Sequence, residues 1–235
     1  MQRLCSLSTL VLTAMFLVAG PVSASGNDGS VKYDVTITNL TRGQTFTPIL
    51  VASHKKGVKL FEVGSEASEQ LALLAEDGAT QPLSDLLLDS GRVFEVTNSG
   101  GLLLPGESVT IAIKTRGQFN RISMAAMLIP TNDGFFSIQG ARAWPGNSAR
   151  VLFSPAYDAG SEPNDELCEN IPGPVCGGVG ASPGAGGEGY VHIHAGVHGI
   201  SGLAEPLTPD ATGGLNPAER DWRNPVAKIT IQRSK

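Results

Sequence analysis

Short segments in which apolar and polar residues alternate recur along most of the chain, and they constrain its fold more than any other feature. At residues 32–39 the side chains of Tyr33, Val35 and Ile37 fall on one face, opposite charged and hydroxyl side chains. This pattern predicts a strand with one buried face. Residues 121–130 are nearly all apolar and predict a central strand buried on both faces. Further strands are predicted at residues 45–53, 92–97, 108–115, 148–153, 189–197 and 225–233.

Two segments between these strands have helical spacing instead. Residues 65–76 repeat apolar side chains at the helical period, with Ser65 as the expected N-cap and Gly78 as the expected end. Residues 81–88 predict a second short helix. Residues 170–189 contain eight glycines and three prolines, which predicts a long loop outside the compact core. About eight to ten strands with irregular connections predict an all-β fold, a sandwich of two sheets.

The N-terminus has the pattern of a secretory signal peptide. Arg3 precedes an apolar run at residues 7–19, and Val22-Ser23-Ala24 resembles a cleavage site. The apolar run is too short for a comfortable membrane span. The pattern predicts a secreted or periplasmic protein that does not span a membrane and is cleaved near Ala24. The expected parts are a signal peptide at 1–24, a polar leader at 25–30 and one domain at 31–235.

The charge of the chain narrows the choice of partner. The chain has 17 basic and 22 acidic residues, which gives a formal net charge of −5. Loss of Arg3 with the signal peptide makes this charge 16 − 22 = −6. Such acidity argues against a nucleic-acid partner, because no basic patch would neutralise the phosphates.

Two cysteines remain outside the expected signal peptide, Cys168 and Cys176. In an oxidising compartment, a pair this close in sequence predicts one local disulfide. A zinc site is less well supported, because no second cysteine pair lies nearby to complete it.

An acidic run at residues 155–166 is the strongest functional feature of the sequence. Its carboxylates would repel one another unless a positive charge lay among them, and Gly160 and Pro163 favour a folded loop over a helix. Several carboxylates on one loop are typical of a Ca²⁺ site, because this ion takes six to eight oxygen ligands. The alternative is a solvated acidic loop without a metal. The acidic residues of the run are Asp158, Glu162, Asp165 and Glu166.

Three closely spaced histidines form a second candidate site. On a strand, His192 and His194 would point to the same face. Two imidazoles so placed can bind Zn²⁺ or Cu²⁺, with His198 or the distant His54 as a third ligand. The alternative is a structural role, in which these side chains hydrogen-bond the backbone of the Gly-rich loop. Nucleophilic catalysis has little support, because the chain has no G-x-S-x-G motif.

Several stretches of the chain resemble the spondin N-terminal domain, the module of F-spondin and mindin that also occurs in bacterial secreted proteins. They are YDVTITNLTRGQTFTPILVASH, RISMAAMLIPTNDGFFS, DAGSEPNDE and WRNPVAKITIQR. The stretch EGYVHIHAGVHG is similar to the bacterial form. The resemblance extends over residues 32–233 and implies an antiparallel β-sandwich of C2-like type.

The resemblance also implies a Ca²⁺ site at one end of the sandwich. Animal members of the family bind the ion through an Asp in an S-P-D-W-type turn and two acids in a D-A-G-T-D loop. The matching residues here are Asp133, followed by Gly134 rather than Trp, and Asp158 with Glu162, where the last acid is Glu rather than Asp. Glu is itself a good Ca²⁺ ligand and is often bidentate. Asp165 is a further candidate ligand.

These features predict a secreted, non-enzymatic, Ca²⁺-binding β-sandwich that interacts with an extracellular protein or glycan. The competing prediction is a periplasmic Cu or Zn protein that uses His192, His194 and His198 and could be an enzyme. The two predictions differ in the metal that the purified protein would carry.

Overall fold

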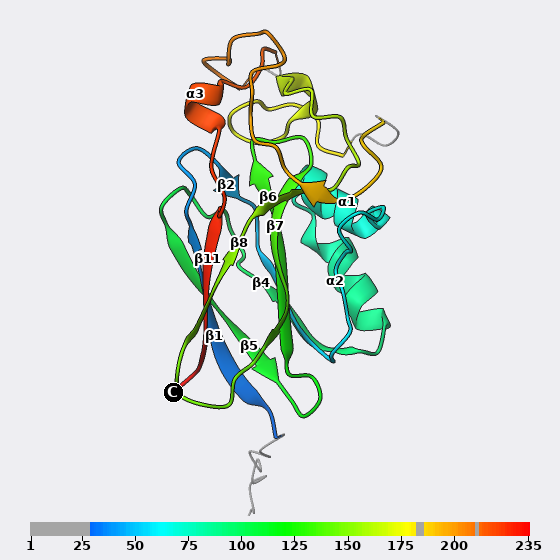
Figure 1. Ribbon diagram of the computed structural model, residues 1–235, viewed down its shortest axis with the longest axis vertical. Coiled ribbons are helices and arrows are strands. Elements are labelled where there is room, and N and C mark those ends of the chain that lie inside the picture. The colour runs from blue at the N-terminus through cyan, green and yellow to red at the C-terminus, as the bar shows by residue number, and fades with distance from the viewer. Residues whose placement is uncertain (1–28, 182–185, 210–211) are drawn as a thin grey trace, which may run out of the picture.

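The computed structural model describes residues 29–181, 186–209 and 212–235. The expected signal peptide at 1–24 and most of the polar leader lie outside these residues. Within them, two antiparallel sheets pack face to face, and irregular loops gather at one end of the sandwich (Figure 1). The predicted all-β sandwich with two short inserted helices is confirmed. No helix in this part of the chain has the length and apolar character needed to cross a membrane.

The smaller sheet is built largely from the strands whose sequences alternate most clearly. Tyr33, Val35 and Ile37 are buried in the sandwich core as predicted, while the residues between them are partly exposed. The first strand of the sheet lies at its centre and pairs with the last strand of the chain. The strand order is β5 (Ser108–Thr115), β1 (Val31–Asn39), β11 (Ala227–Arg233) and β8 (Arg150–Ser154).

The larger sheet has the apolar strand β6 (Arg121–Ile129) near its centre, and every β6 residue after Arg121 is buried. One face of the sheet packs on the sandwich core and the other face packs on helices. This two-sided burial explains why β6 lacks alternation. The strand order around β6 is β10 (His192–Ile193), β9 (Ala156–Asp158), β7 (Gly134–Arg142), β6, β3 (Leu50–His54) and β4 (Val93–Asn98), with β2 (Thr45–Phe46) also paired to β6.

Helices α1 (Glu69–Asp77) and α2 (Thr80–Asp89) cover the outer face of the larger sheet (Figure 1). Helix α1 begins later than predicted, because Ser68 rather than Ser65 is the N-cap and accepts a hydrogen bond from a first-turn backbone N–H at 3.2 Å. Gly78 ends the helix in the left-handed conformation, as predicted. The buried leucines of the two helices that pack on the sheet are Leu71, Leu74, Leu83 and Leu87.

Three strands of the larger sheet depart from the sequence prediction. Strands β7 and β9 are not predicted, because the first four residues of β7 are all buried and β9 is only three residues long. The strand expected at residues 189–197 is reduced to the two residues of β10. These three neighbouring strands form the edge of the sheet at which the candidate site lies.

The Gly/Pro-rich segment contributes to the core, contrary to the prediction. Cys168 and Cys176 form the predicted disulfide, and both are buried in the main core together with Ile171. The segment begins at a short 3₁₀ helix, η1 (Cys168–Asn170), and passes close to it again at Gly178. A Cβ atom at Gly178 would lie 2.0 Å from the Cys168 carbonyl oxygen, so only glycine fits there.

Candidate metal centre

The candidate site lies where strands β7, β9 and β10 run side by side. Asp158 ends β9 and is paired with Gly134 of β7 on one side and His192 of β10 on the other. Asp133 directly precedes Gly134, and its carbonyl oxygen accepts a hydrogen bond from the Ala159 N–H at 3.2 Å. Sheet register therefore brings together residues from three distant parts of the sequence.

Asp133 is completely buried, and its two carboxylate oxygens differ in their surroundings. Oδ2 accepts hydrogen bonds from the backbone N–H of Ser161 at 2.8 Å and that of Glu162 at 3.1 Å, and from the Ser161 hydroxyl at 3.2 Å. Oδ1 is buried and has no hydrogen-bond partner among the described residues. One oxygen thus fixes the acidic loop, and the other is available to a ligand.

Asp158 is also completely buried. Its Oδ1 accepts a hydrogen bond from the Gly160 N–H at 2.8 Å, and its Oδ2 accepts one from the Asn164 side-chain amide at 2.6 Å. Both bonds come from the acidic loop that follows β9. The loop therefore orients this carboxylate while leaving lone pairs on both oxygens.

Burial and a nearby negative charge destabilise the charged forms of these two acids. Burial, followed by the charge of Asp158, raises the pKa of Asp133 to about 8. Burial also raises the pKa of Asp158, although the Asn164 hydrogen bond and His192 oppose that shift. No lysine or arginine among the described residues forms an ion pair with either carboxylate. A cation placed between them would relieve both penalties.

The other two candidate ligands of the run, Glu162 and Asp165, have different surroundings. Glu162 is buried in the same loop, and its backbone N–H is bound to Asp133. Asp165, the further candidate ligand, has both oxygens occupied: Oδ1 accepts from Asn132 at 3.0 Å and from the Leu167 N–H at 2.9 Å, and Oδ2 accepts from Asn170 at 2.5 Å. The structure thus gives Asp165 a role in holding the loops.

His192 and His194 both lie near Asp158, although only His192 belongs to strand β10. The Nε2 atom of His192 lies 3.4 Å from Asp158 Oδ1, and that of His194 lies 4.0 Å from Asp158 Oδ2. Burial lowers the pKa of His194 to about 4, so its ring is neutral near pH 7. The two histidines therefore lie around the same carboxylate that the Ca²⁺ prediction uses.

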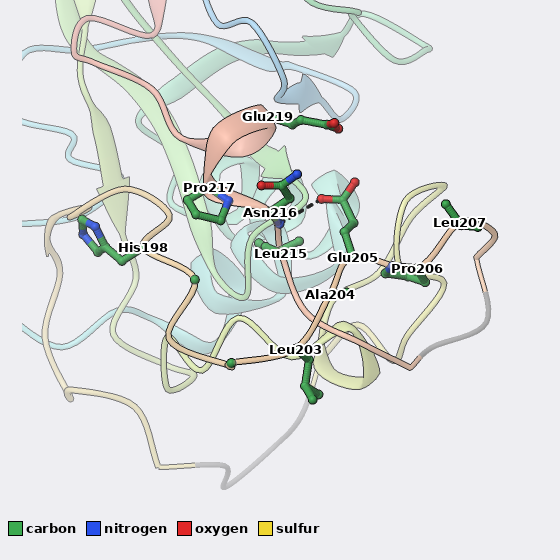
Figure 2. Close-up of a pocket in the computed structure, with 12 residues that line it drawn as sticks. His198, Leu203, Ala204, Glu205, Pro206, Leu207, Leu215, Asn216, Pro217 and Glu219 are labelled. Atoms are coloured by element: carbon green, nitrogen blue, oxygen red, sulfur yellow. Dashed lines mark hydrogen bonds between the residues drawn. The ribbon is translucent and has the colours of Figure 1, made fainter.

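The other histidines are elsewhere. His54 is buried between strands and bonds the Lys55 carbonyl oxygen at 2.8 Å and the Ser123 hydroxyl at 2.7 Å, which gives it a structural role. His198 lines a pocket of about 690 Å³ in the loops at the end of the sandwich (Figure 2). In that pocket Glu205 accepts a hydrogen bond from the backbone N–H of Asn216 at 3.1 Å. The structure does not bring His198 or His54 together with Asp158.

Sequence reasoning misses Glu188, which the structure places beside His192. Glu188 Oε2 lies 3.9 Å from His192 Nε2. One ligand atom each from Asp158, Glu188 and His192 lie within 4.8 Å of one another. The only signal in the sequence is a single acid at the end of the Gly-rich segment, four residues before His192.

Comparison with known families agrees with this architecture. Residues 37–142 match the model of the Spondin_N family. This part of the chain is similar to the spondin N-terminal domain family. The matched part of the chain runs from within β1 to the end of β7 and includes Asp133, whereas Asp158 and His192 lie beyond it. The family is one of non-catalytic, extracellular-type modules. Comparison with curated proteins gives no match.

Proposed function

We propose that this protein is a secreted, non-enzymatic module that binds Ca²⁺ through Asp133, Asp158 and Glu162. The observation that carries the proposal is the pair of completely buried carboxylates, Asp133 and Asp158, whose charge no lysine or arginine of the described residues balances in an ion pair. A buried charge without a partner is costly unless the group is protonated or a cation is bound. With a pKa of about 8, Asp133 keeps its proton at neutral pH in the metal-free protein, and a bound cation would displace that proton.

The oxygen atoms available as ligands at this position suit a hard cation. Asp133 Oδ1 has no hydrogen-bond partner within the described residues, and Asp158 keeps lone pairs on oxygens that the loop has already oriented. Carboxylate oxygens on a loop of irregular shape match the variable coordination of Ca²⁺ better than the strict octahedron of Mg²⁺. When bound, the ion would supply the positive charge that the two acids lack. The chain's own contribution is to hold the acidic loop on Asp133 through the Ser161 and Glu162 amides.

The cellular location of the protein is part of the same proposal. We place it outside the cytoplasm, secreted or periplasmic, after cleavage of the signal peptide near Ala24. The Cys168–Cys176 disulfide supports this placement, because such bonds persist in oxidising compartments. An extracellular protein or a glycan is the proposed partner, since the net negative charge of the chain does not suit nucleic acid. The module would act by binding and without catalysis.

Thermal unfolding with and without Ca²⁺ tests the proposal. At Ca²⁺ concentrations near 100 times the dissociation constant, binding should stabilise the fold by about 2.7 kcal/mol. For a domain of this size, that is a rise in Tm of about 5–10 °C over the value in chelator. Asp158→Asn should remove most of the rise. Unfolding that is indifferent to Ca²⁺, or a rise that survives Asp158→Asn, would contradict the proposal.

A further inference from the structure

We infer that Asp158, Glu188 and His192 form a second metal site, one for a divalent cation that prefers imidazole, with Zn²⁺ as the representative ion. The site lies on the β10 side of Asp158, whereas the proposed Ca²⁺ site lies on the β7 side, where Asp133 is. The two sites share Asp158 and differ in their other ligands. The inference does not depend on Ca²⁺ binding.

The spacing of the three ligand atoms suits tetrahedral coordination. Zn²⁺ binds nitrogen and carboxylate oxygen at about 2.0–2.2 Å, so two of its ligands lie about 3.3–3.6 Å apart. His192 Nε2 is 3.4 Å from Asp158 Oδ1 and 3.9 Å from Glu188 Oε2. Only small movements of Glu188, whose side chain is partly exposed, would complete this geometry. Three protein ligands would leave a fourth position open to water or to a further ligand.

The hydrogen bond on the other side of the His192 ring prepares Nε2 to bind a metal. Nδ1 lies 3.0 Å from the Ile193 carbonyl oxygen, which can only accept, so Nδ1 carries the proton. In the neutral ring, Nε2 then has a lone pair, and this lone pair faces a carboxylate oxygen of Asp158. Two such acceptors at 3.4 Å require a proton or a cation between them. Donation from the second ring nitrogen to a backbone carbonyl is typical of metal-ligating histidines.

His194 has the opposite tautomer and is therefore not one of the ligands. Its Nδ1 accepts a hydrogen bond from the Gly196 N–H at 3.0 Å, so in the neutral ring Nε2 carries the proton. The side chain is only 4% exposed, and Nε2 has no hydrogen-bond partner in the described part of the chain. The Nε2 atom of His194 lies 4.0 Å from Asp158 Oδ2, whereas His192 faces the other oxygen, Oδ1.

Glycines at close contacts bring Glu188 to the site. A Cβ atom at Gly187 would lie 2.5 Å from the Gly160 carbonyl oxygen, and one at Gly160 would lie 2.3 Å from the Tyr190 carbonyl oxygen. The Gly189 N–H also donates to the Gly160 carbonyl oxygen at 2.8 Å. The end of the Gly-rich segment is thus packed directly on the acidic loop. Glu188 is held further by the Asn164 amide, which donates to its Oε1 at 3.1 Å and also bonds Asp158.

Zn²⁺ binding to the metal-free protein at neutral pH tests the inference, by calorimetric titration with the bound metal counted after dialysis. We expect one Zn²⁺ per chain. His192→Gln and Glu188→Gln should each weaken binding at least about 10-fold, which is the smallest loss typical even for residues that only support a metal ligand. His198→Gln is the matched control, because His198 lies in the pocket of Figure 2 rather than in this cluster, and it should leave Zn²⁺ affinity unchanged.

Three results would overturn the inference: no stoichiometric Zn²⁺, unchanged affinity in His192→Gln, or an equal loss in His198→Gln. Thermal unfolding in chelator checks that each variant is folded. If His192→Gln does not fold, Glu188→Gln decides alone, because it changes a partly exposed loop residue.

Failure of this inference can be distinguished from failure of the proposed Ca²⁺ site. Asp133→Asn should abolish Ca²⁺ binding and leave Zn²⁺ affinity unchanged, and loss of Zn²⁺ in that variant would contradict a separate site. A wild type that binds Zn²⁺ in this pattern but no Ca²⁺ would sustain the present inference and defeat the proposed function. A wild type that binds Ca²⁺ but no Zn²⁺ would sustain the proposed function and defeat the present inference.

Discussion

Two groups of acids lie within one small region and have very different surroundings. The inner acids, Asp133 and Asp158, are completely buried, and their pKa values are raised. The outer acids, Asp165 and Glu166, have hydrogen-bond donors on every carboxylate oxygen. Glu166 receives the backbone N–H groups of His198 at 2.6 Å and Ile200 at 2.9 Å. The outer acids are thus satisfied by the protein. Of the inner acids, Asp133 has one oxygen without a partner among the described residues, and Asp158 has a single donor on each oxygen.

The difference follows from what the backbone offers at each position. The outer acids lie among loops whose backbone N–H groups have no partner in a sheet. Their carboxylates accept hydrogen bonds from these groups and so stabilise the loops. The inner acids also accept backbone N–H groups, but these all come from the acidic loop after β9 and leave Asp133 Oδ1 without a partner among the described residues. Residues that look alike in the run Asp158 to Glu166 therefore have separate roles, one in holding the fold and one in binding.

The largest expected effect comes from an outer acid. Glu166→Ala should destabilise the fold by about 3 kcal/mol or more, because two charge-assisted hydrogen bonds contribute about 1.5–3 kcal/mol each. The loss should be equal in Ca²⁺ and in chelator, since Glu166 is not part of the proposed site. Chemical denaturation in both conditions measures this. A loss of stability seen only in the Ca²⁺-containing sample would show that Glu166 also takes part in Ca²⁺ binding.

An inner acid should behave in the opposite way. Asp133→Asn should lose the Ca²⁺-dependent stabilisation of about 2.7 kcal/mol expected near 100 times the dissociation constant. In chelator at pH 8 it should be at least as stable as the wild type, because the amide removes a buried charge beside Asp158. The same denaturation experiment gives both values. A variant that is much less stable in chelator would show that the Asp133 charge has a structural role.

A smaller effect is expected from pH in the metal-free protein. The folded pKa of Asp133, about 8, is above its ordinary value of 3.8, so the folded state retains a proton and its stability falls as pH rises towards 8. His194 acts with the opposite sign, but its pKa falls from 6.5 to about 4, so its contribution ends near pH 6.5. Asp158, with a raised pKa, adds to the Asp133 effect.

Between pH 6.5 and 8 the metal-free wild type should therefore lose about 1–2 kcal/mol. Saturating Ca²⁺ should abolish this decline, and Asp133→Asn should reduce it. Melting temperatures across this range check the sign. Stability that rises with pH in the metal-free protein would show that Asp133 is ionised throughout.

Much of the fold could be predicted from the sequence, and the reasons are local. Strands β1, β5 and β11 alternate because each has one face on the core, and β6 is apolar because both of its faces are covered. Strand β7 escapes prediction, because its first half is buried on both faces and Gly140 interrupts the pattern. The acidic loop is visible because its acids are close in sequence.

The assembly of the site could not be predicted from local patterns. Glu188 and His192 meet Asp158 only through the pairing of β9 with β10 and through glycine contacts between two loops. The opposite tautomers of His192 and His194 depend on which backbone group each ring meets. Only the family resemblance predicts a role for Asp133, since one Asp in a turn carries no signal of its own.

Calorimetric titration of the metal-free protein with Ca²⁺ tests the central claim most directly. The account predicts one Ca²⁺ per chain in the wild type, no measurable binding in Asp133→Asn, and unchanged binding in Asp165→Asn, the matched outer-acid control. Absence of Ca²⁺ binding in the wild type, or loss of binding in the outer-acid variant with the inner acids intact, would contradict it.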